Sequence, residues 1–239
     1  MPIPCYLALT GAEFANSLPL PKKLAWMACH FSCYGTGLSN LPRKLPAGSI
    51  IILNDRTPPH RHDPQRILEQ LQAVAEVCKP DGFLLDFQRS GIALNQQIAQ
   101  ILVTGLPCPV AVTTEYAPEL QCPVFLEPPP LHLPVSEHIA PWEDREIWLE
   151  LAVETATYTI TAQGCQIDVT ENQPLSEPNF TEDSLFCRYH TALFEDRAVF
   201  TLQRTRNELE ALLSHPLPIA RAIGLYQQFG NAFCSNNPT

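Results

Sequence analysis

The sequence alternates short, continuous apolar runs with segments of helical periodicity. The run SIIILND (49–55) is typical of a strand that is buried on both faces. The segment that follows, HDPQRILEQLQAVAEVC (62–78), carries an apolar stripe at helical spacing, with Asp63 as the N-cap and Pro64 at the first helical position. A strand followed by a helix is the repeating unit of α/β proteins.

The same unit recurs along the chain. Further strands are predicted at 23–31, 83–87, 109–115, 123–127, 197–203 and 219–229, and further helices at 95–105 and 207–215. Seven or eight such strands in a chain of 239 residues suit a (β/α)8 barrel. The competing fold is an open doubly wound sheet, but the sequence lacks the Gly-rich phosphate loop that would support it. We therefore expect one TIM-type barrel domain over residues 1–239, and no cofactor.

The second half of the chain is less regular. A proline-rich, aromatic stretch is followed by TYTITAQGCQIDV (157–169), which alternates around Gln163-Gly164 like a β-hairpin. The prolines exclude a continuous helix. We expect residues 128–180 to be an insertion or irregular segment within the barrel, where loops carry specificity.

Composition limits the partners. The net charge is −10 and the pI is about 5.1, which argues against nucleic acid or an anionic membrane as a partner. No apolar run approaches the ~20 residues that span a bilayer, and the N-terminus does not resemble a secretion signal.

The nine cysteines are odd in number and most lie in apolar runs, which favours reduced thiols. We expect a cytoplasmic protein with a small-molecule or oligosaccharide ligand; its oligomeric state is left open.

The run DGFLLDFQR (81–89) combines a buried strand with polar side chains on one face. Alternation puts Phe83 on the opposite face from Leu84, Asp86 and Gln88. In a barrel the aromatic face lies against the outer helices, so Asp86 and Gln88 are expected near the C-terminal mouth, where barrel enzymes do their chemistry.

This run resembles the D-G-x-D-x-D-x-E signature of family 18 glycoside hydrolases, the chitinases and their relatives. Asp81, Gly82 and Asp86 match the signature, whereas Leu84 and Gln88 depart from it. The resemblance implies a (β/α)8 barrel and a carbohydrate ligand, and we expect the motif to close the third barrel strand.

The departure at Gln88 decides which functions the resemblance allows. In the family, the final Glu protonates the leaving oxygen and the preceding Asp orients the substrate's acetamido group; a glutamine cannot donate that proton. The resemblance therefore implies either a non-catalytic carbohydrate-binding barrel or an enzyme whose acid has moved. In the second case Asp86 would pair with Glu115 or Glu127, which close the next two predicted strands.

Other polar residues near predicted strand ends are candidates for substrate binding, because such groups hydrogen-bond hydroxyls or stack on sugar rings. These candidates are His30, Asp55, Gln88, Tyr189, Gln203 and Tyr226. Each has a structural alternative: a core histidine for His30, a turn or cap for Asp55, and barrel filling for Tyr226.

A third hypothesis is a metal-dependent hydrolase, suggested by His60, His62 and Asp63. In amidohydrolase barrels an H-x-H closes the first strand, but here it lies in a proline-rich loop and Asp63 already caps a helix. We therefore expect no metal site. Trp142 and Trp148 are either platforms of a binding cleft or packing residues, and packing is favoured because Trp is usually largely buried.

Overall fold

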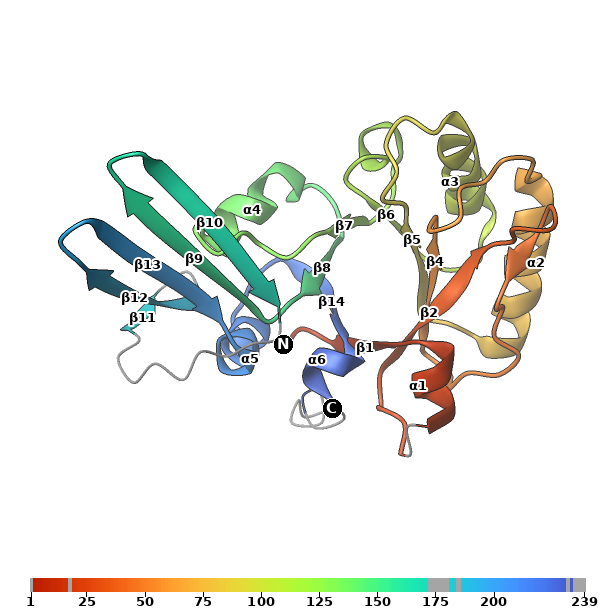
Figure 1. Ribbon diagram of the computed structural model, residues 1–239. Helices are drawn as coiled ribbons and strands as arrows, with labels where there is room; N and C mark the ends of the chain where they lie inside the picture. Colours follow the sequence, from red (N-terminus) through yellow and green to blue (C-terminus); the bar gives the residue numbers. More distant parts are fainter. Residues whose placement is uncertain (1, 17–18, 172–180, 184–185, 231–232, 234–239) are drawn as a thin grey trace.

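Eight parallel strands close into a barrel in this computed structural model, which describes residues 2–16, 19–171, 181–183, 186–230 and 233 (Figure 1). The barrel order is β1-β2-β4-β5-β6-β7-β8-β14, and β14 pairs with β1 to close the ring. The strands are β1 (Cys5–Leu9), β2 (Leu24–Phe31), β4 (Ile50–Asn54), β5 (Gly82–Asp86), β6 (Val110–Thr113), β7 (Val124–Leu126), β8 (Ile147–Leu151) and β14 (Ile219–Leu225). The predicted TIM-type fold is confirmed.

The helices around the barrel are unequal in length. The two longest, α2 (Pro64–Cys78) and α3 (Ala93–Gly105), lie side by side outside β4 and β5 (Figure 1). As predicted, Asp63 caps α2, because its carboxylate accepts the Gln65 backbone N–H at 3.0 Å. The others are α1 (Gly11–Asn16), η1 (Ala117–Glu119), α4 (Val135–Ile139), η2 (Ala140–Trp142), α5 (Arg206–Ser214) and α6 (Tyr226–Phe229). Between β2 and β4 the described chain forms no helix, only the short strand β3 (Leu38–Ser39).

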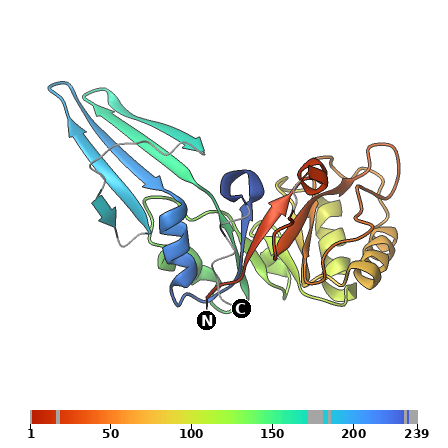
Figure 2. The same ribbon diagram turned by 90° about the horizontal axis from the view of Figure 1, so that it is seen from below.

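A second, antiparallel sheet is inserted between β8 and α5. Its strands, in the order β10-β9-β13-β12-β11, are β10 (Gly164–Glu171), β9 (Glu154–Thr161), β13 (Arg197–Arg204), β12 (Cys187–Leu193) and β11 (Thr181–Asp183). The predicted hairpin is β9–β10, in which Thr161 pairs with Gly164. Figures 1 and 2 show this sheet projecting from the barrel on the side away from α2 and α3.

Three strand predictions need correction. The run 197–203 is not a barrel strand but part of β13, which pairs antiparallel with β9 and β12. The run was predicted as a barrel strand because it is apolar, but its apolar residues pack within the second sheet. The run 219–229 is a strand only to Leu225, and α6 follows. Since β1 was not anticipated, β5 is the fourth barrel strand rather than the third.

The range 128–180, expected to be an insertion, holds elements of both parts of the molecule. It contains α4, η2 and the barrel strand β8, as well as β9 and β10 of the second sheet. Its residues 172–180 lie outside the described part of the chain.

Two apolar layers hold the barrel together. Phe83 and Leu85 on β5, and Phe87 directly after it, pack outward with the helices, whereas Leu84 belongs to the cluster that fills the lumen. The buried members of the lumen cluster are Tyr6, Ala8, Ala25, Ile50, Ile52, Leu84, Ala111, Phe125, Trp148 and Ile223. The alternation predicted for this strand is confirmed, and it leaves Asp86 and Gln88 above an apolar floor.

Polar groups close the N-terminal end of the barrel. The Tyr6 hydroxyl donates to Asp81 at 2.8 Å, and the Lys23 ammonium lies 3.4 Å from the same carboxylate. The Arg221 guanidinium lies 4.4 Å from the centre of the Trp148 ring, which is fully buried. Trp148 is therefore a packing residue, and Asp81 contributes to closing the barrel at the end opposite the mouth.

Gly82 tests how tightly this end is packed. A Cβ at this position would lie 2.6 Å from Cη2 of Trp148 and 2.9 Å from the Pro109 carbonyl oxygen. We expect Gly82→Ala to lower the free energy of unfolding by about 1–3 kcal/mol, the usual cost of overpacking a core. Urea denaturation measures the change. The control is Gly35→Ala, whose Cβ would meet its nearest neighbour at 3.7 Å; an equal effect in both variants would contradict this account.

Candidate functional site

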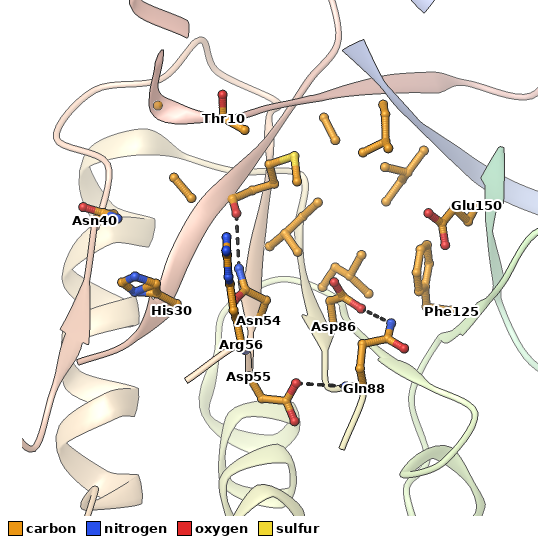
Figure 3. A pocket seen from close by; sticks show the side chains of 18 of the residues that line it. Thr10, His30, Asn40, Asn54, Asp55, Arg56, Asp86, Gln88, Phe125 and Glu150 are labelled. Carbon is orange, nitrogen blue, oxygen red and sulfur yellow. Dashed lines mark hydrogen bonds between the residues drawn. The ribbon is translucent and has the colours of Figure 1, made fainter. Parts of the chain in front are cut away.

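A cavity of about 730 Å³ opens at the C-terminal mouth of the barrel (Figure 3). Its volume lies within the roughly 300–1,000 Å³ usual for ligand sites. Seven barrel strands or the turns after them line it, together with Asn40 from the β3 loop. Its polar lining residues include Thr10, His30, Asn40, Asn54, Asp55, Arg56, Asp86, Gln88, Arg89 and Glu150. Three predicted binding residues, His30, Asp55 and Gln88, thus lie in one cavity with the predicted catalytic residue Asp86.

Asp86 and Gln88 form a hydrogen-bonded pair in this cavity. Gln88 Nε2 donates to Asp86 Oδ1 at 2.5 Å (Figure 3). Burial raises the pKa of Asp86, and the charges of Asp55 and Glu127 add to the increase, whereas the hydrogen bond from Gln88 opposes it. The carboxylate is therefore held in the cavity, with a raised pKa, next to an amide that can donate a hydrogen bond but not a proton.

Asp55 anchors the turn that carries Gln88. Its side chain, only 2% exposed, accepts the backbone N–H groups of Gln88 at 3.0 Å and Arg89 at 3.1 Å. It also accepts from Asn95 Nδ2 at 3.0 Å, and the same amide nitrogen donates to the Tyr116 hydroxyl at 3.2 Å. Tyr116 in turn donates to the Arg89 carbonyl oxygen. Asp55 lines the cavity, but its oxygens are engaged by the protein, so the contacts indicate positioning.

The opposite side of the cavity carries an imidazole and one guanidinium group. His30 and Arg56 project from the ends of β2 and β4, across the cavity from Asp86 and Glu150 (Figure 3). Burial lowers the pKa of His30, and the charge of Arg56 lowers it further. Within the described chain, His30 Nδ1 is buried and has no hydrogen-bond partner. The imidazole therefore has a hydrogen-bonding nitrogen that the described residues leave unsatisfied.

Glu150 is a cavity residue that the sequence analysis did not identify. It lies on β8, two residues after Trp148, so both side chains face the lumen. Glu127, predicted as a catalytic residue, lines a smaller adjoining cavity of about 230 Å³ together with Gln88 and Glu150. The alternation in IWLEL would have located Glu150 if the run had been recognised as a barrel strand.

Four predicted site residues are not brought to the cavity. Glu115 is exposed in the turn after β6. Tyr189 is on β12, where its ring centre lies 6.0 Å from that of Phe200, and Gln203 is buried in β13 and donates to Thr155 Oγ1 at 3.0 Å. Tyr226 begins α6 and packs against the outer core. Two of these residues, Gln203 and Tyr226, lie in the runs 197–203 and 219–229, where the strand predictions were wrong.

The loop that suggested a metal does not assemble a metal site. No group of three or more His, Cys, Asp or Glu side chains that could hold a metal ion occurs among the described residues. His62 is buried with its ring centre 5.1 Å from that of Phe31, and Asp63 caps α2. In the same part of the chain, no helix is long and apolar enough to cross a membrane.

Two solved structures resemble this chain in fold. One is the spore cortex-lytic enzyme SleL of Bacillus cereus, with a TM-score of 0.55, 9% sequence identity and coverage of 98% of this chain and 72% of that one. The other is a GH18 chitinase from Cycas revoluta in complex with (GlcNAc)4, with a TM-score of 0.55, 10% identity and coverage of 96% and 97%. No protein-family model and no curated protein matches the sequence. At these identities the likeness establishes the barrel fold.

Asp55→Ala tests the anchoring of the turn. The substitution removes the acceptor of two backbone N–H groups and of the Asn95 amide, and a buried donor left unpaired costs about 1–3 kcal/mol. We expect a loss of at least this size in urea denaturation, and displaced backbone amide resonances for Gln88 and Arg89 in NMR spectra. Asp144→Ala, at an exposed aspartate outside the cavity, is the control; unmoved amide resonances in Asp55→Ala would contradict the anchoring role.

The raised pKa of Asp86 predicts a pH-dependent effect of Asp86→Asn. A carboxyl whose folded pKa exceeds its unfolded value of about 3.8 destabilises the fold once it ionises, and the cost grows as pH rises through the folded pKa. We expect the stability of Asp86→Asn relative to wild type to increase between about pH 3.5 and about pH 7. Urea denaturation at several pH values measures this difference. A difference that falls with rising pH would contradict the raised pKa.

Proposed function

We propose that the protein is a chitinase-like barrel that binds an oligosaccharide containing N-acetylglucosamine at the mouth, without the acid chemistry of that family. The observation that carries the proposal is the Asp86–Gln88 pair in a ligand-sized cavity at the C-terminal mouth. The GH18 neighbour, a variant with two substitutions, one of them glutamate to glutamine, is in complex with (GlcNAc)4, and this supports an oligosaccharide as the ligand.

The residues of the cavity suit such a ligand chemically. The carboxylate of Asp86 can accept an acetamido N–H, and the Gln88 amide can donate to a glycosidic or carbonyl oxygen. His30 and Arg56 can hydrogen-bond hydroxyls from the other side. Met27 and Phe125 give the site an apolar surface for the faces of sugar rings. Because Gln88 has no acidic proton, we infer binding rather than substrate-assisted hydrolysis.

Hydrolysis is the second candidate, and Glu150 is the observation that favours it. Glu150 and Asp86 share the cavity, and Glu127 lies next to it, so a pair of carboxylates of the kind glycosidases use is available. The raised pKa of Asp86 suits a general acid. Release of reducing ends from (GlcNAc)4 by wild type, lost in Glu150→Gln, would support this candidate over binding alone.

Eight described cysteines are free, four of them buried, which fits a reducing compartment. We therefore extend the proposal to a cytoplasmic protein whose partner is a small saccharide.

The proposal predicts stabilisation by (GlcNAc)4. A ligand that binds only the folded state, present at a hundredfold excess over Kd, adds about 2.7 kcal/mol to the free energy of unfolding. We expect a thermal-shift assay to show a rise in Tm of several degrees for wild type, and calorimetric titration to give a saturable Kd. Asp86→Asn should lose most of this shift because the acceptor charge is gone.

Asp144→Asn is the matched control, since it makes the same chemical change at an exposed site outside the cavity and should keep the shift. No shift in wild type, or an equal shift in Asp86→Asn, would contradict binding at the mouth.

A further inference from the structure

A second cavity, of about 660 Å³, adjoins the mouth on the side of β2. It shares Gly11, Ala28 and Asn40 with the main cavity, so a ligand that extends from the mouth on this side reaches it directly. It lies between α1 and the loop that follows β3. Its size permits at least one further sugar unit, since it is comparable to the main cavity.

The second cavity has an aromatic floor. Trp26 and Phe14 both line it, with ring centroids 5.4 Å apart in an edge-to-face arrangement. The Trp26 indole N–H donates to the Asn40 carbonyl oxygen at 3.0 Å, which fixes the ring against the loop. Leu41 and Pro42 extend the apolar surface. Trp26 is only partly buried, so a rigid aromatic surface is offered to a ring-shaped ligand.

The charged side chains of this cavity are all cationic. Arg43 and Lys44 line it, and no Asp or Glu does. Both are exposed, and within the described chain neither charged group has an ion pair, hydrogen bond or ring contact. The protein as a whole carries a net charge of −10, so two unpaired cations beside an aromatic surface contrast with the rest of the molecule.

The cationic character continues into the mouth. Arg56 lines the main cavity beside His30, and within the described residues its guanidinium group has no ion pair or hydrogen bond. Of the acids that line the mouth, Asp86 and Glu150 lie on the other side (Figure 3), whereas Asp55, next to Arg56, is engaged by the backbone of Gln88 and Arg89 and by the Asn95 amide. Cations without an ion pair therefore line the second cavity and the side of the mouth that adjoins it.

We propose that the cavity lined by Trp26, Arg43 and Lys44 is a subsite for an acidic sugar unit, so that the ligand is an oligosaccharide in which a carboxylate-bearing residue follows an N-acetylated one. The ring of this unit packs on Trp26, and its carboxylate pairs with Arg43 and Lys44. This inference rests on the proposed function, because it needs the neighbouring unit to occupy the mouth.

The experiment compares two tetrasaccharides of the same length by calorimetric titration. One is (GlcNAc)4, which is neutral, and the other is a hyaluronan tetrasaccharide, which alternates N-acetylglucosamine with glucuronate. At low ionic strength we expect wild type to bind the hyaluronan tetrasaccharide about fivefold more tightly, as two exposed ion pairs can provide. Salt at about 0.5 M should screen the two ion pairs and so remove most of this preference.

Two double variants assign the preference to the subsite. Arg43→Gln/Lys44→Gln should abolish it and leave the affinity for (GlcNAc)4 unchanged. Lys22→Gln/Arg197→Gln, at exposed positions outside both cavities, removes the same charge and should keep it. As a separate readout, the hyaluronan tetrasaccharide should change tryptophan fluorescence in wild type and not in Trp26→Phe.

The outcomes separate this inference from the proposed function. Equal affinities for the two sugars, or a preference that survives Arg43→Gln/Lys44→Gln, would overturn the acidic subsite and leave binding at the mouth intact. An equal loss of affinity for both sugars in that variant would also overturn it. If neither sugar binds wild type, the proposed function fails, and the subsite fails with it.

Discussion

The barrel is closed because β1 pairs with both β14 and β2. Cys5 aligns with Ala222 in one pairing, and Leu7 aligns with Leu24 in the other, so the first strand joins the last to the second. Closure removes both edges of the sheet and forces alternate residues of eight strands into one lumen. The apolar floor, the sealed lower end and the cavity at the mouth all follow from this convergence.

The two ends of the barrel use polar residues differently. At the N-terminal end, Asp81 is held by Tyr6 and Lys23, so its charge is compensated within the protein. At the mouth, Asp86 meets the amide of Gln88 but also faces the charges of Asp55 and Glu127. The run 81–88 therefore contributes to stability through its first residue, Asp81, and to the candidate site through Asp86 and Gln88. Asp55 contributes to both stability and the site, because its buried carboxylate accepts the backbone N–H of Gln88 and so fixes the position of that residue.

The sequence predicted those parts of the fold that depend on local signals. The cap of α2, the alternation on β5 and the β9–β10 hairpin are encoded within short windows, and all three are present. The errors are non-local. The run 197–203 is as apolar as a barrel strand, and only its antiparallel partners distinguish it. Conversely, β8 was not predicted as a strand because it follows a proline-rich segment, and Glu150 on β8 was therefore not predicted as a site residue. A rule that places site residues at the ends of predicted strands misses the residues of any strand that is not predicted.

Whether the mouth of the barrel binds a saccharide can be seen in a crystal structure of the protein grown with saturating (GlcNAc)4. We expect sugar density in the main cavity, with an acetamido group within hydrogen-bonding distance of Asp86 and Gln88 and rings beside Phe125. An empty mouth at saturating ligand, or sugar bound only on the second sheet, would contradict it.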